Sequence, residues 1–129
     1  MARKKSSGPT DREMAILGVL WEKGPSTVRE VHEALDADSQ TGYTTTLKLM
    51  QIMVEKGLLV REDDEHRRGH VYRPALSEER TQKQLIQDLL DRVFAGSAEK
   101  LVMRALSARK VSPKELKRIR EMLDQMEGK

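Results

Sequence analysis

Cysteine is absent from the sequence, which excludes disulfide bonds and thiolate metal sites and fits a cytoplasmic protein. Only one Phe, one Trp and two Tyr occur, so we expect a small hydrophobic core that a second chain helps to complete. No apolar run approaches the roughly 20 residues that a membrane span needs. The basic N-terminus is not followed by the apolar segment of a secretory signal. These absences predict a cytoplasmic protein without a membrane segment.

The first part of the chain, residues 1–75, has no net charge. The net charge is +3, but residues 1–75 hold 12 basic and 12 acidic residues, whereas residues 76–129 hold 12 and 9. Any positive footprint for nucleic acid in the first part must therefore come from the placement of charges. We divide the chain into a disordered basic tail (1–9), a first domain (10–75) and a helical region (76–129).

Groups suited to catalysis or to metal binding do not converge in the sequence. His32 lies on a helix face, His66 in a charged loop and His70 at the start of a strand. No Gly-rich phosphate loop, nucleophile motif or metal-ligand spacing accompanies them. The sequence predicts neither an enzyme nor a protein with a cofactor or a bound metal.

Two capping boxes, of the form S/T-x-x-E, open the first two predicted helices. The first begins at Thr10 and its helix runs to about Lys23, where Gly24 and Pro25 stop it. The second begins at Thr27, and its helix ends near Ala37. A turn at 38–40 leads into a third helix over 41–57, closed by Gly57. Two helices joined by a short polar turn predict a helix-turn-helix unit.

The start of the third helix carries the residues that we expect to bind DNA. Three consecutive threonines are poor helix formers, which favours a role in contacts over a role in helicity. Hydroxyl groups and a lysine at a helix start suit phosphates and base edges in the major groove. An ordinary solvated helix start is the alternative. The predicted DNA-binding residues of this helix are Tyr43, Thr44, Thr45, Thr46 and Lys48.

Two short strands, Leu58 to Glu62 and His70 to Pro74, are predicted after the third helix. The polar segment between them contains Arg67 and Arg68, so the hairpin would be the wing of a winged helix, with these two arginines touching DNA. Three neighbouring acidic residues oppose that contact, and a solvated tip is the alternative. The predicted fold is mostly α-helical with a small β-hairpin: an N-terminal winged helix-turn-helix followed by a C-terminal helical dimerisation region.

Three further helices are predicted, over about 77–95, after a cap at Ser97 and after Ser112-Pro113. Their apolar stripes have little of their own chain to cover them, so we expect a homodimer. Packing back onto the first domain is the alternative. The predicted dimerisation residues are Leu85, Leu89, Leu90, Val93, Phe94, Leu101, Val102, Leu106, Leu116, Ile119 and Leu123.

Four segments together resemble the penicillinase-repressor family (BlaI/MecI type), the small dimeric winged-helix repressors of bacteria. They are TDREMAILGVLWEKGPSTVREVHEAL, YTTTLKLMQIMVEKGLLVRE, HVYRPALS and LLDRVFAGSAEKLVMRALSARKVSPKEL, within about 9–127. The resemblance implies a homodimer that sits on an inverted-repeat operator in double-stranded DNA and blocks transcription. It maps the recognition helix onto Tyr43 to Val54, where Thr44 and Thr45 match the family pattern and Lys48, Leu49 and Ile52 depart from it.

Regulation within this family differs between relatives. Copper-responsive relatives carry a C-terminal cysteine cluster, which this chain lacks. Antibiotic-responsive relatives are cut by a regulatory protease at an Asn-Phe bond in the helix that corresponds to 97–109, and this chain departs from them with Arg104-Ala105 at the matching bond. A winged helix that binds only protein is the remaining alternative, and the neutral charge of residues 1–75 favours it slightly.

Overall fold

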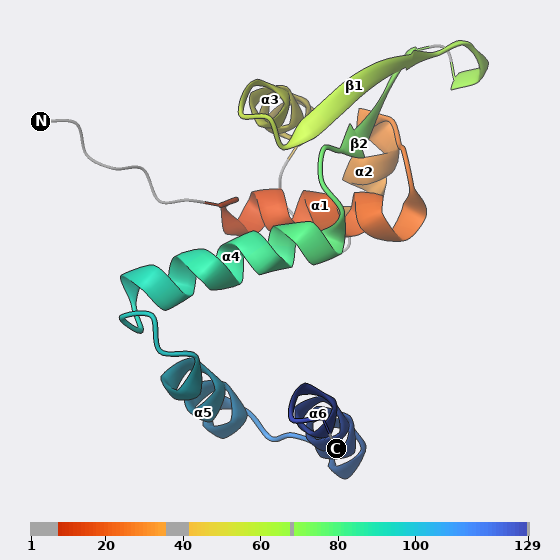
Figure 1. The fold of residues 1–129 in the computed structure, drawn as a ribbon. Coiled ribbons are helices and arrows are strands. Elements are labelled where there is room, and N and C mark those ends of the chain that lie inside the picture. The colour runs from red at the N-terminus through yellow and green to blue at the C-terminus, as the bar shows by residue number, and fades with distance from the viewer. Residues whose placement is uncertain (1–7, 36–41, 68, 129) are drawn as a thin grey trace, which may run out of the picture. The chain divides into compact units, whose positions relative to one another are not determined.

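The computed structural model describes residues 8–35, 42–67 and 69–128. Three predicted features lie outside these residues: residues 1–7 of the predicted disordered tail (1–9), the turn at 38–40, and Arg68. The fold is mostly helical with one antiparallel hairpin, as predicted from the sequence (Figure 1). The elements in chain order are α1 (Asp11–Lys23), α2 (Val28–Leu35), α3 (Tyr43–Glu55), β1 (Leu59–Asp64), the 3-10 turn η2 (Glu65–Arg67), β2 (Gly69–Pro74), α4 (Glu78–Arg92), α5 (Ala98–Ala108) and α6 (Pro113–Met126).

The capping residues predicted from the sequence start the helices. Thr10 and Glu13 form the reciprocal pair, in which the Glu13 N–H donates to Thr10 Oγ1 and the Thr10 N–H donates to Glu13 Oε1. Thr27 and Glu30 form the same pair before α2. Such a box satisfies backbone donors that have no partner inside the helix. α1 ends at Gly24, whose φ of 88° suits glycine.

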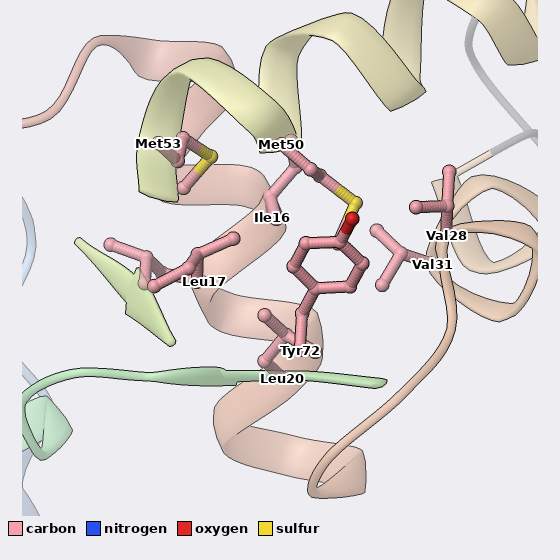
Figure 2. Packing of buried hydrophobic residues seen from close by; sticks show 9 residues of the cluster. Ile16, Leu17, Leu20, Val28, Val31, Met50, Met53 and Tyr72 are labelled. Carbon is pink, nitrogen blue, oxygen red and sulfur yellow. The ribbon is translucent and has the colours of Figure 1, made fainter. Parts of the chain in front are cut away.

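One hydrophobic core joins α1, α2, α3 and the hairpin. The ring of Tyr72 lies in the middle of the cluster, between β2 and Met50 (Figure 2). Burying a large apolar side chain contributes about 1.5–3 kcal/mol, so this cluster is the main source of stability in the domain. Its fully buried members are Ile16, Leu17, Leu20, Val28, Val31, Met50, Met53, Leu59 and Tyr72.

A charged pair borders this core, and sequence reasoning did not predict it. Glu13 is only 2% exposed, and Lys56, one residue beyond α3, places Nζ 2.8 and 2.9 Å from its two carboxylate oxygens. Burial acts to raise the pKa of Glu13, but hydrogen bonds from Lys56 and Thr10 outweigh it and hold the pKa below its ordinary value. The pair ties the start of α1 to the end of α3.

The hairpin is longer at its tip than the sequence indicated. β1 pairs with β2 from Leu59 opposite Pro74 to Asp64 opposite Gly69, so Asp63 and Asp64 belong to a strand and not to the loop. Ser26, between α1 and α2, adds an antiparallel bridge to Tyr72, with N–O distances of 3.1 and 2.8 Å. The hairpin is thereby anchored to the helix-turn-helix unit.

The chain forms two compact units that divide between Ile86 and Gln87, inside α4. The start of α4 belongs to the first unit because the Trp21 indole N–H donates to the Leu76 carbonyl at 3.1 Å and Thr81 is buried. Trp21 is half-buried. In unit 2, no described residue is buried, and the unit has no core of its own. None of the helices described is both long and apolar enough to cross a membrane.

Candidate nucleic-acid interface

The two faces of α3 differ in their exposure to solvent. Thr46, Met50 and Met53 point into the domain and are buried, whereas Thr44, Thr45 and Lys48 are exposed. The exposed positions continue along the helix through Gln51, Ile52 and Glu55, which is the spacing of one helical face. A helix of 13 residues is about 20 Å long, long enough to lie along a DNA major groove. Three of the predicted DNA-binding residues therefore share one accessible face.

Thr46 requires a correction. Its side chain is 5% exposed, and its Oγ1 lies 3.1 Å from His32 Nδ1 on α2. The hydroxyl is thus occupied within the helix-turn-helix unit, and this position does not fit a contact with DNA. Consecutive helical residues lie about 100° apart, so three in a row are spread over about 200° around the axis and do not all share one face.

Tyr43 begins α3 and is held by two residues of α2. Its ring meets the His32 ring edge-on, with the centroids 5.9 Å apart, and the Arg29 guanidinium carbon lies 5.1 Å from the Tyr43 centroid. A cation over an aromatic face is attracted by the ring quadrupole. This contact fixes a positive charge beside the first turn of α3.

Arg29 was missed by the sequence analysis. It lies within the capping box of α2, where it reads as an ordinary exposed residue. Its contact with Tyr43 joins two helices across a connection, and no local spacing signals such a contact. Among the residues that the structure describes, Arg29 forms no ion pair, so its charge is available to an anion.

The start of α3 is open to an acceptor. Gly42 occupies the N-cap position and supplies no side chain, and no described side chain caps the helix. The Gly42 carbonyl accepts from the N–H groups of Thr45 and Thr46. Uncapped N–H groups and the positive end of the helix dipole favour a phosphate at this position.

A groove of about 330 Å³ runs between α2, α3 and the wing. It brings Arg29 and Tyr43 to the same surface as His70 on β2, so α2, α3 and the hairpin border a shared depression. Its remaining lining residues are Thr27, Val28, Leu47, Gly69 and Tyr72.

Two acidic residues of the wing have hydrogen-bond partners within the hairpin. Asp63 Oδ1 lies 2.5 Å from His70 Nδ1, and Asp64 Oδ1 accepts the His66 N–H at 2.9 Å. Arg67 ends the 3-10 turn, while Arg68 lies outside the described part of the chain.

The predicted dimerisation residues lie on α4, α5, α6 and, for Val93 and Phe94, just beyond the end of α4, and none is fully buried. Val93 is 64% exposed, Leu123 53% and Val102 47%. Leu85 belongs to unit 1, where its side chain lies against Gly8. Leu89 is also exposed, and the others are half-buried: Leu90, Phe94, Leu101, Leu106, Leu116 and Ile119.

Across the described ranges, no cluster of three or more His, Asp or Glu side chains could hold a metal.

Comparison with known proteins gives a consistent picture. A family model described as penicillinase repressor matches residues 9–125. Two curated relatives, each named transcriptional regulator BlaI and from the CDC 1551 and H37Rv strains of Mycobacterium tuberculosis, are 40% identical over 65 residues. That alignment covers 50% of this chain and 46% of each relative, so it spans less than half of their length.

Solved structures with a similar arrangement include a MarR family protein from Bacillus stearothermophilus. It has a TM-score of 0.48 and 23% identity, over 95% of this chain and 78% of that one. A MarR-like transcriptional regulator from Thermotoga maritima has a TM-score of 0.45 and 22% identity, over 92% and 74% of the two chains.

Proposed function

This chain belongs to the penicillinase repressor family, and we propose that it is a DNA-binding transcriptional repressor that acts as a homodimer on an inverted-repeat operator. Proteins of this family are repressors and not enzymes. The observation that carries the proposal is the division of α3 into a buried face and an exposed polar face. The relatives named transcriptional regulator BlaI support it.

Base reading is assigned to the exposed side chains near the start of α3. The hydroxyls of Thr44 and Thr45 can donate to or accept from base edges, and their methyl groups can contact the thymine methyl. Lys48, one turn further along, reaches either guanine or a phosphate. Tyr43 and Arg29 support the same surface, where the Arg29 guanidinium and the uncapped N–H groups of α3 suit one phosphate.

The wing supplies contacts that do not depend on sequence. Arg67 ends the 3-10 turn at the tip of the hairpin, and Arg68 follows it in the sequence. A loop that reaches the backbone positions the protein but carries little sequence information. The wing is therefore assigned to affinity, and α3 to base preference.

Homodimerisation is supported by the state of unit 2. Its described residues include large exposed apolar side chains and none that is buried, an arrangement that is unfavourable for a separate monomeric unit. A second copy would cover these side chains by a two-fold, self-complementary interface. A two-fold dimer then matches an inverted repeat, because each copy of α3 meets one half-site.

Release from DNA is assigned to cleavage by a regulatory protease in α5. Arg104 and Ala105 are both exposed in the middle of this helix. A cut there would separate α6 from the rest of the chain and remove the apolar residues Leu116, Ile119 and Leu123 from the dimer face.

An electrophoretic mobility shift with the full-length protein and fragments of its own upstream region tests the proposed function. We expect one slow species at nanomolar protein that an unrelated fragment does not compete away. A protein-binding winged helix would give no shift with any fragment, and that result would overturn the proposal.

A further inference from the structure

A dense concentration of positive charge lies in unit 2, far along the chain from α3. Between residues 104 and 118, six of the fifteen residues are basic and one, Glu115, is acidic. The segment comprises the end of α5, the connection, and the first half of α6. We call it the basic segment, and its basic residues are Arg104, Arg109, Lys110, Lys114, Lys117 and Arg118.

These six side chains face solvent without neutralisation. All of them are exposed, and within residues 8–35, 42–67 and 69–128 none forms an ion pair. Elsewhere in the described residues, Lys56 pairs with Glu13, Arg73 with Glu62 and Arg92 with Asp88. The charges of the basic segment are therefore available to an external anion.

The basic residues of α6 do not serve the helix that carries them. Lys114 lies in the first turn of α6, at the positive end of the helix dipole, where a cation is unfavourable. Lys117 and Arg118 follow at i+3 and i+4, the positions that face Lys114 on a helix, and like charges at these spacings repel. An anion bound across the three side chains would relieve this repulsion.

The first 75 residues lack the excess of positive charge that the basic segment has. They contain the proposed DNA-reading helix and the wing, yet their basic and acidic residues balance. Binding to duplex DNA draws much of its affinity from cations that neutralise phosphates and release counterions. Residues 1–75 carry no net positive charge for this task.

We propose that the basic segment binds the phosphate backbone of duplex DNA, without base preference, and supplies much of the salt-dependent affinity of the repressor. This inference rests on the proposed function, because unit 1 brings the duplex to the same molecule and raises its effective concentration. A homodimer presents the segment twice, which doubles the number of phosphates it neutralises.

The test uses the full-length protein and a fluorescent 40-base-pair duplex of shuffled sequence, with affinity measured by anisotropy between 50 and 200 mM NaCl. The variant is Lys114→Gln, Lys117→Gln and Arg118→Gln. The matched control is Lys23→Gln, Arg80→Gln and Lys83→Gln, which removes three exposed charges from α1 and α4. Both variants have the same net charge, so only the position of the lost charges differs.

We expect the slope of log affinity against log salt to flatten by at least about 2 in the α6 variant, since each lost phosphate contact removes about 0.9. Between 50 and 200 mM NaCl, its affinity should then fall by a factor at least about 16 times smaller than that of the wild type. The control should keep the wild-type slope. Equal slopes in the two variants, or no change in either, would overturn the inference and would favour an acidic protein surface as the partner.

Two further variants keep the result interpretable. The charge-retaining variant Lys114→Arg, Lys117→Arg and Arg118→Lys must keep the wild-type slope. If the glutamine variant no longer dimerises in sedimentation, Arg104→Gln, Arg109→Gln and Lys110→Gln replaces it, with the same expected flattening. Preference for the upstream duplex over the shuffled one should persist in all of them. Loss of that preference in the wild type would instead count against the proposed function.

Discussion

His32 and Thr46 join α2 to α3 through a hydrogen bond of 3.1 Å between Nδ1 and Oγ1. This bond turns Thr46 inward and leaves its two predecessors, Thr44 and Thr45, on the exposed face. Three threonines that are identical in the sequence therefore have two functions. One stabilises the helix-turn-helix unit, and two are available to DNA.

Thr46→Val tests this division. The substitution keeps the shape of the side chain but leaves His32 without its partner, so we expect a loss of about 1–2 kcal/mol in the free energy of unfolding. Thr45→Ala, at an exposed site, should change stability by less than about 0.5 kcal/mol. Urea denaturation of both variants provides the comparison. Equal stabilities would contradict the inward role of Thr46.

The pair of Glu13 and Lys56 predicts a dependence of stability on pH. The pKa of Glu13 is lower in the folded state, so its ionised form stabilises the fold fully above the ordinary value of 4.5. This contribution should be lost as pH falls below 4.5 through the folded pKa.

Glu13→Gln isolates that contribution. At pH 7 the variant should lose about 1.5–3 kcal/mol of stability, the range for hydrogen bonds to a charged group. As pH falls to 3, the difference between wild type and variant should shrink, because Glu13 becomes protonated. Urea titrations at several pH values measure it. A difference that stays constant from pH 7 to 3 would contradict the account of Glu13.

Ala95, three residues beyond α4, has a left-handed conformation with φ of 51°, and Gly96 follows with φ of 80°. The Gly96 N–H donates to the carbonyl of Leu90, six residues earlier, at 2.7 Å. Ala95→Gly should relieve backbone strain and stabilise the protein by about 0.5–1 kcal/mol. Gly96→Ala should destabilise it by a similar amount or more. Thermal unfolding at one fixed chain concentration compares the two variants. A destabilised Ala95→Gly or a stabilised Gly96→Ala would contradict this account of the turn.

Sedimentation velocity tests the homodimer. At micromolar concentration we expect a species of about twice the 14.7 kDa chain mass. Val93→Asp and Leu123→Asp, at exposed positions of α4's end and α6, should shift it to the monomer, because each buries a charge in the proposed interface. A monomeric wild type would contradict the dimer.

Local sequence signals predicted much of the fold. The capping boxes at Thr10 and Thr27, the glycine stop at Gly24 and the apolar stripes placed the helices, because each signal acts within a few residues. The hairpin was predicted, but its strands extend further toward the tip, since cross-strand pairing of Asp63 with His70 depends on register and not on strand propensity.

Contacts between distant segments were beyond sequence reasoning. The bond between His32 and Thr46 and the cation of Arg29 over Tyr43 each join α2 to α3. The pairing of Glu13 with Lys56 spans 43 residues, and a glutamate in a capping box gives no sign of a second partner. The contacts of α2 with the start of α3 and the inward position of Thr46 therefore emerged only from the packing.

The central claim is that the exposed face of α3 reads DNA sequence. It is tested most directly by the affinity of the full-length protein for its own upstream duplex relative to a shuffled duplex, in the wild type, Thr45→Ala and Lys48→Ala, at one salt concentration. We expect the wild type to prefer the upstream duplex by at least about 1,000-fold. Thr45→Ala should lose about 1–3 kcal/mol of that preference, and Lys48→Ala should weaken binding to one or both duplexes. Wild-type behaviour of both variants, or no preference in the wild type, would contradict the account.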